Sequence, residues 1–160
     1  AHWEGFVVES FKLLITYLNN EHLDKKMVIN ELYTFSLQNV LKPLAGKQSF
    51  EQSYQFVERF VEDFDKELYI DTSLLSANSN LNYKQMTNIL SKFGMENCLE
   101  GYKEDINQLV NQRNSIAHGE NGIIIEEKHV SNKISVLQEL FDSIILEFEN
   151  YLSQKMYLKR

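Results

Sequence analysis

Three side chains within one short stretch are of the types that handle a phosphate group. They lie in Arg113-Asn114-Ser115-Ile116-Ala117-His118. Arginine carries a permanent positive charge, asparagine offers a carboxamide, and imidazole titrates at about pH 6.5 and can move protons. A cation, a carboxamide and a proton carrier this close together predict half of a site for phosphate chemistry that needs no metal ion.

Arg113 raises a question about its partner. On an ideal helix it falls near the middle of an apolar stripe, and such a stripe normally faces the core. The stripe consists of Ile106, Leu109, Val110, Ile116 and Ala117. Removing an unpaired charge from water costs several kcal/mol, so a guanidinium on this face needs a partner. The structural interpretation is an ion pair with another helix, through Glu58, Glu62 or Asp63, and the functional interpretation is a bound phosphate.

Asn114 and His118 are four residues apart, so they share one flank of the helix and can act on the same group. His118 also lies in the last predicted turn, where the negative end of the helix dipole favours imidazolium. Gly119 lets the chain leave the helix sharply. A simple helix cap is the alternative interpretation of His118.

Arg113 and His118 are separated by about 140° around an ideal helix. One copy of the helix therefore does not aim both side chains at one phosphate. Two copies packed about a twofold axis would bring both pairs together, and the small Ala117 would permit close approach. The spacing thus predicts a homodimer with a composite site.

The elements that must position these residues are predicted to be helices. The chain has 160 residues, of which 43% are apolar, with one Pro and six Gly. So few turn-forming residues exclude a barrel or sandwich. We expect one all-α domain over residues 1–160, an up-and-down bundle of about five to six helices. The chain opens at Ala1 without a Met and inside an apolar helical pattern, so we also expect a segment before Ala1.

Apolar residues recur at helical spacing in six regions. The predicted helices run to about residue 20, over 24–42, from 50 to 68, from 83 to 93, over 99–118, and from about 130 into the basic tail at 155–160. Ser49 and Gln52 form a capping box, and Asn82 is a candidate cap. We expect a polar loop from Tyr69 to Asn80 and a short extended piece from Gly122 to Glu127.

The charge and cysteine content exclude some classes of protein. The formal net charge is −7, so broad coating of nucleic acid is disfavoured and any contact with it must be local. The main basic clusters, Lys25-Lys26 and the tail with Lys155, Lys159 and Arg160, are expected to be solvated. Cys98 is the only cysteine, which suits a reducing cytosol. No membrane span or signal peptide is visible, so we expect a cytoplasmic protein.

The stretch Arg113-Asn114-Ser115-Ile116-Ala117-His118-Gly119 resembles the R-N-x-x-x-H motif of the HEPN superfamily. The motif also lies at the end of a late helix that one more long helix follows, as in that family. The opening Ala1-His2-Trp3-Glu4-Gly5-Phe6-Val7 and the stretch Ser79-Asn80-Leu81-Asn82-Tyr83 are similar to a toxin-type or defence-associated bacterial branch.

The resemblance implies a metal-independent endoribonuclease that acts as a homodimer with paired motifs. The implied catalytic residues are Arg113, Asn114 and His118. The 2'-hydroxyl of RNA would attack the adjacent phosphate, giving 2',3'-cyclic phosphate and 5'-hydroxyl ends, and DNA would be spared. No cofactor is expected. The implied partners are RNA and a cognate antitoxin protein.

Other functions are weighed against this one. The histidines, including His2, His22 and His129, show no paired metal-ligand spacing, and Glu126 with His129 offers two ligands at most. The sequence has no phosphate-binding glycine loop and no nucleophile elbow. The main alternative is a noncatalytic helical module that binds a protein or nucleotide partner.

Overall fold

A computed structural model describes residues 2–75, 80–119 and 127–160 of the chain. The elements in these ranges are helical, apart from two isolated bridges that join Asp24 to Glu67 and Val28 to Leu158. The α-helices are α1 (His2–Asn20), α2 (Asn30–Ser36), α3 (Gln38–Leu41), α4 (Phe50–Phe64), α5 (Tyr83–Lys92), α6 (Lys103–Ala117) and α7 (Glu127–Ser153). The 3-10 turns are η1 (Lys42–Leu44), η2 (Thr72–Leu74) and η3 (Glu100–Tyr102). The prediction of an all-α bundle is confirmed.

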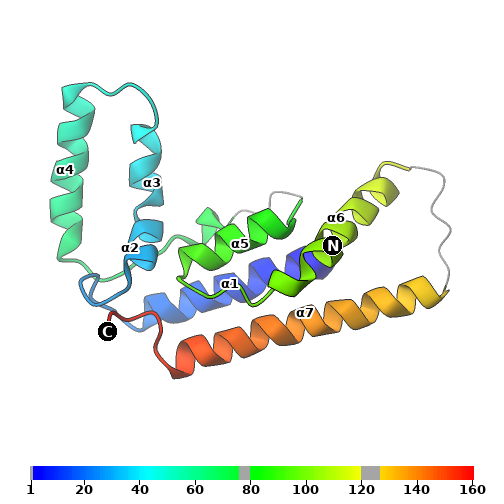
Figure 1. Ribbon diagram of the computed structural model, residues 1–160. Helices are drawn as coiled ribbons and strands as arrows, with labels where there is room; N and C mark the ends of the chain where they lie inside the picture. Colours follow the sequence, from blue (N-terminus) through cyan, green and yellow to red (C-terminus); the bar gives the residue numbers. More distant parts are fainter. Residues whose placement is uncertain (1, 76–79, 120–126) are drawn as a thin grey trace.

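Helix α1 forms the centre of the bundle. Figure 1 shows α5 and α6 along one side of it and the long α7 along the other, while α2, α3 and α4 form an arm at one end. Phe11 of α1 is fully buried, and its ring lies 4.9 Å from that of Phe93 and 4.8 Å from that of Phe148 on α7. Aromatic contacts of this kind bury large apolar area. The apolar stripe of α1 is therefore core, as its spacing predicts.

The helix ends near the candidate site follow the sequence signals. The side chain of Asn82 caps α5 by accepting a hydrogen bond from the backbone N–H of Gln85 at 3.0 Å. Gly94 and Gly119 follow α5 and α6 with φ of +64° and +68°. Glycine adopts this left-handed conformation without the steric penalty of a side chain. The signals therefore predicted where α5 and α6 end.

The prediction of a second helix over residues 24–42 is wrong for its first part. Residues 24–29 are not helical, and the helix begins at Asn30 and breaks at Leu37. Long-range backbone hydrogen bonds explain the difference. The N–H of Leu68 donates to the carbonyl of Leu23 at 2.7 Å, and the N–H of Lys159 donates to the carbonyl of Met27 at 2.8 Å. Tertiary pairing thus overrides the local helical pattern.

Helix α4 begins with the predicted capping box, but its apolar stripe does not enter the core. The side chain of Ser49 accepts from the N–H of Gln52, and the side chain of Gln52 accepts from the N–H of Ser49. The stripe is exposed at Phe50, Tyr54, Val57, Val61 and Phe64. The helix ends before Leu68, which is buried. Helix α2 contacts α4 through Tyr33, whose ring centroid lies 5.9 Å from that of Phe60.

Two expectations fall partly outside the described residues. Of the expected extended piece from Gly122 to Glu127, residues 122–126 lie outside them, and Glu127 begins α7. Of the expected loop from Tyr69 to Asn80, residues 76–79 lie outside them. The part before 76 contains η2 and two buried core residues, Ile70 and Leu75. In the ranges that the structure covers, no helix is long and apolar enough to cross a bilayer.

Cys98 and Glu147 share an environment that disfavours negative charge. Burial, with the nearby Glu147 carboxylate, raises the pKa of the Cys98 thiol to about 11. At neutral pH this cysteine is therefore protonated and unreactive. Burial and the charge of Glu96 raise the pKa of Glu147 in turn. One carboxylate oxygen of Glu147 is buried without a hydrogen-bond partner among the described residues.

We predict that Glu147→Gln stabilises the protein at neutral pH. Because the pKa of Glu147 is raised by folding, the wild type is favoured when this group is protonated and loses stability as the pH rises through the folded pKa. The glutamine variant has no ionisable group at this position, so its stability does not fall in this way as the pH rises. We expect its Tm to exceed that of the wild type by about 2 °C at pH 7, with the difference vanishing at about pH 4.

Thermal unfolding followed by circular dichroism at several pH values measures this difference. Glu149→Gln is the matched control, because Glu149 is an exposed carboxylate on the same helix. A gain in Tm that does not depend on pH, or an equal gain in the control, would contradict the assignment.

Candidate functional site

The R-N-x-x-x-H motif occupies the last turn of α6 and its cap. The backbone N–H of His118 donates to the carbonyl of Asn114 at 2.9 Å, and the N–H of Gly119 donates to the carbonyl of Ile116 at 3.2 Å. His118 is the C-cap residue and is exposed. The predicted end of the helix is confirmed, and the imidazole is open to solvent at the negative end of the helix.

A chain of hydrogen bonds fixes the guanidinium of Arg113. Its Nη1 donates to Oδ1 of Asn114 at 2.9 Å, and Nδ2 of Asn114 donates to Oδ1 of Asn80 at 2.8 Å. The Nη2 of Arg113 lies 3.9 Å from Oε2 of Glu4. Asn114 thus contacts both the cation and Asn80, which lies three residues before α5, so its side chain orients Arg113.

The segment from Asn80 to Tyr83 connects the N-terminus of α1 to α6. The indole Nε1 of Trp3 donates to the carbonyl of Leu81 at 3.0 Å, and this bond is buried. The backbone N–H of Tyr83 donates to Oδ1 of Asn107 at 3.2 Å. Together with the bond from Asn114 to Asn80, these contacts set the position of the motif relative to α1.

A pocket of about 250 Å³ lies where these elements meet. Arg113, Glu4, Asn80 and His2 are among its polar lining residues. Its apolar lining residues are Trp3, Leu81, Leu109, Val110, Ile116 and Leu137. His118 does not line this pocket. Within one chain the structure therefore brings Arg113 and Asn114 together and leaves His118 outside.

The expectation that Arg113 lies on a core face is wrong. Its side chain is 40% exposed, and of the apolar stripe only Ile106 is buried. The suggested partners on α4 are also wrong, because a carboxylate of α1, that of Glu4, lies 3.9 Å from the guanidinium instead. Asp63 pairs with Lys25 instead. The reason is that α6 extends beyond the core toward its C-terminal end, so the same stripe changes from buried to exposed along the helix.

Sequence reasoning did not assign Glu4, Asn80 or His2 to the site. Glu4 and Asn80 occur in the two stretches that resemble a HEPN branch, but neither has a spacing relation to the motif. Only the fold brings residues 2–4 and 80 to α6. The one available signal was the resemblance of those two stretches.

Apolar side chains are exposed within the motif and on the first turns of α7. Ile116 of α6 and Val130 and Ile134 of α7 are large and exposed, and Ala117 is also exposed. Figure 1 shows that the end of α6 and the beginning of α7 diverge from each other beyond the core. This end of the molecule therefore presents apolar surface next to a cation and an imidazole.

The fold and the motif define an all-helical module with a polar R-N-x-x-x-H segment at the end of its penultimate helix. The chain belongs to the RiboL-PSP-HEPN family, whose sequence model matches residues 1–150. It is therefore a member of the HEPN superfamily. No curated protein and no solved structure matches the chain.

We predict that the contact between Glu4 and Arg113 contributes little to stability. Exposed ion pairs typically contribute about 0 to 1 kcal/mol; the Glu4 side chain is only 17% exposed, but the separation of 3.9 Å is long for an ion pair. We expect Glu4→Gln to lower the free energy of unfolding by less than about 1 kcal/mol in urea denaturation. The matched control is Glu9→Gln, which removes the exposed pair of Glu9 with Lys12 on the same helix. A loss of several kcal/mol with Glu4→Gln alone would make Arg113 a structural anchor.

Proposed function

We propose that this protein is a metal-independent endoribonuclease whose catalytic residues are Arg113, Asn114 and His118. The observation that carries the proposal is the arrangement at the end of α6. A guanidinium fixed by a carboxamide lines a surface pocket, and an exposed imidazole follows at the helix cap. Membership of the HEPN superfamily supports the same chemistry, because members of that superfamily are usually ribonucleases.

The proposed reaction is transfer of a phosphodiester within the RNA. The 2'-oxygen forms a bond to the adjacent phosphorus while the bond from phosphorus to the 5'-oxygen breaks. His118 takes the proton of the 2'-hydroxyl or returns one to the leaving 5'-oxygen, and such proton transfer is typically worth about 10² to 10⁴ in rate. Arg113 neutralises the charge on the phosphate. Asn114 acts through Arg113, because its carboxamide already contacts the guanidinium.

We propose a homodimer in which two motifs share one crevice. Within a chain, His118 does not line the pocket that contains Arg113, so one copy does not surround a phosphate with both groups. The exposed Ile116 supplies apolar surface within the motif, and Val130 and Ile134 add exposed apolar surface on α7. Burying such surface favours association. The dimer would also gather several positive charges on an otherwise acidic protein.

The proposal includes a biological role as a toxin or phage-defence effector with a cognate antitoxin protein. The resemblance of the opening stretch and of residues 79–83 to that bacterial branch supports this role. The net charge of −7 is consistent with this role. An acidic nuclease has weak general affinity for RNA, so it acts on selected substrates.

A noncatalytic binding module is the second candidate function. The contacts of Arg113 with Glu4 and of Asn114 with Asn80 favour it, because they connect α6 to other elements and give both residues a structural role. The two candidates differ in what His118 does, since its side chain takes part in neither contact.

We predict that the purified protein cleaves RNA in excess EDTA and that His118→Ala lowers the rate by about 10² or more. The products should carry 2',3'-cyclic phosphate and 5'-hydroxyl ends, which gel mobility and end-specific labelling distinguish. A substrate with a single 2'-deoxy nucleotide should survive at that position. His22→Ala is the matched control, because His22 is an exposed histidine that pairs with Glu67. Undiminished cleavage by a folded His118→Ala variant would refute the assignment.

We predict that two inactive variants complement each other. Arg113→Ala and His118→Ala should each abolish cleavage as homodimers. Mixed dimers retain one Arg113 and one His118 in the shared crevice, so an equal mixture, after unfolding and refolding together, should regain part of the wild-type rate. Native mass spectrometry checks that mixed dimers form. If mixed dimers form and stay inactive, the composite site is wrong.

A further inference from the structure

Helix α4 carries an apolar stripe that the described residues leave open to water. The side chains of the stripe range from 39% exposed, at Phe64, to 85% exposed, at Phe50. None of the residues of α4 is buried. Helices of this length are marginal in water alone, and most of their stability in proteins comes from packing of an apolar face. A contiguous apolar surface of this kind is typical of a contact with another molecule.

The stripe has the spacing of a coiled-coil seam. Its members are separated by four, three, four and three residues along the chain: Phe50, Tyr54, Val57, Val61 and Phe64. This alternation is that of the a and d positions of a heptad, which form a narrow apolar line against a second helix. The stripe therefore fits the side of another helix.

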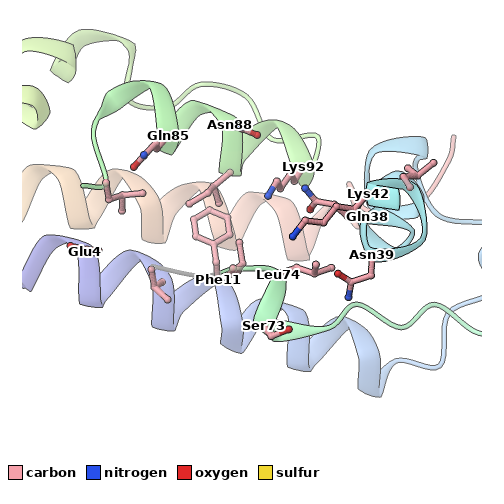
Figure 2. Close-up of a pocket in the computed structure, with 15 residues that line it drawn as sticks. Glu4, Phe11, Gln38, Asn39, Lys42, Ser73, Leu74, Gln85, Asn88 and Lys92 are labelled. Carbon is pink, nitrogen blue, oxygen red and sulfur yellow. The ribbon is translucent and has the colours of Figure 1, made fainter. Parts of the chain in front are cut away.

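The stripe is separate from the pockets of the bundle and from the motif. Figure 2 shows a pocket of about 830 Å³ between α1 and α5, with Gln38 and Lys42 at one end. Residues of α4 line neither this pocket nor the one beside Arg113. Figure 1 shows α4 as the outer element of the arm, at the end of the molecule away from the last turn of α6. What covers the stripe therefore need not touch the candidate site.

One flank of the stripe is acidic. On an ideal helix, Glu51, Glu58 and Glu62 project within about 40° of one another, next to the stripe. All three are exposed, and within the described ranges none of them forms an ion pair. The basic residue of α4 is Arg59, which an ideal helix places on the face opposite the stripe. The apolar seam is therefore bordered by negative charge along one side.

A second copy of α4 is a poor occupant of this stripe. In an antiparallel pair about a twofold axis each flank faces its own copy, so the glutamates would face glutamates. In a parallel pair the acidic flank would face the flank that carries Phe60, and that flank packs on Tyr33 of α2 in the same chain. Neither arrangement places a cation opposite the glutamates.

We infer that the α4 stripe docks an amphipathic helix of a partner protein that carries lysine or arginine along one edge of its apolar face. The apolar residues of that helix would pack on the stripe, and its cations would pair with Glu51, Glu58 and Glu62. Charges that border an apolar seam select the partner and its orientation. The inference goes beyond the proposed function, because docking at α4 requires no cleavage of RNA, and each can fail without the other.

Fluorescence anisotropy with two designed helical peptides tests the inference. Both peptides have about three heptads with leucine at a and d, and one carries lysine at e and g where the other carries glutamate. We expect saturable binding of the lysine peptide to the wild type, about tenfold or more tighter than binding of the glutamate peptide. Val57→Gln, in the middle of the stripe, should weaken binding by about tenfold or more. Leu13→Gln, at an exposed leucine of α1, is the matched control and should bind as the wild type does.

Charge reversal separates docking at α4 from general attraction of a cationic peptide to an acidic protein. The double variant Glu58→Lys with Glu62→Lys should prefer the glutamate peptide. Asp142→Lys with Glu149→Lys makes the same change of net charge at exposed positions of α7, and this control should still prefer the lysine peptide. Should Val57→Gln fail to fold, the reversal variants decide alone.

Absence of saturable binding of the lysine peptide overturns the inference. So does equal affinity of the wild type for the two peptides, or a change of preference in the α7 control equal to that in the α4 variant. Sedimentation of the wild type and of Val57→Gln tests for a second copy on the stripe. A dimer that Val57→Gln abolishes overturns the inference, and the same oligomeric state in both proteins supports it.

Discussion

The position of the motif depends on how residues 80–83 are held between α1 and α6. The buried bond from the indole of Trp3 to the carbonyl of Leu81 ties this segment to the N-terminus of α1. The bond from Asn114 to Asn80 then ties it to the motif. A buried hydrogen bond is strongly favoured because either group would otherwise lose its bond to water without replacement. Through this segment the fold fixes the carboxamide of Asn114, and through Asn114 it fixes the guanidinium of Arg113.

Local signals predicted much of the fold because they act within a few residues. Asn82 located the start of α5, Gly119 located the end of α6, and apolar spacing located α1 and α7. The same signals failed over residues 24–29, where pairing with distant segments outweighs helix propensity. They also could not show that the stripe of α4 is exposed. Periodicity indicates which face of a helix is apolar, but only tertiary structure decides what covers it.

The candidate site could be predicted only in part for a related reason. The motif residues are near each other in sequence, so their common helix was visible. A carboxylate near Arg113 comes from residue 4, and the side chain that accepts a hydrogen bond from Asn114 comes from residue 80. No spacing rule connects positions so far apart in the chain. The exposure of Arg113 also could not be read from the stripe, because a stripe on a helix that leaves the core changes from buried to exposed along its length.

The partial exposure of Arg113 bears on its proposed chemistry. An arginine buried in an internal ion pair would lose that pair on binding a phosphate, and breaking a buried pair commonly costs about 3 to 5 kcal/mol. The carboxylate of Glu4 is instead 3.9 Å away from a guanidinium that is 40% exposed. In the proposed reaction, a phosphate that displaces Glu4 would replace this long contact and not a buried ion pair. The bond to Asn114 would restrict the guanidinium before the RNA arrives, so that less side-chain entropy is lost on binding. The contacts that support a structural role for Arg113 are thus compatible with the proposed catalytic role as well.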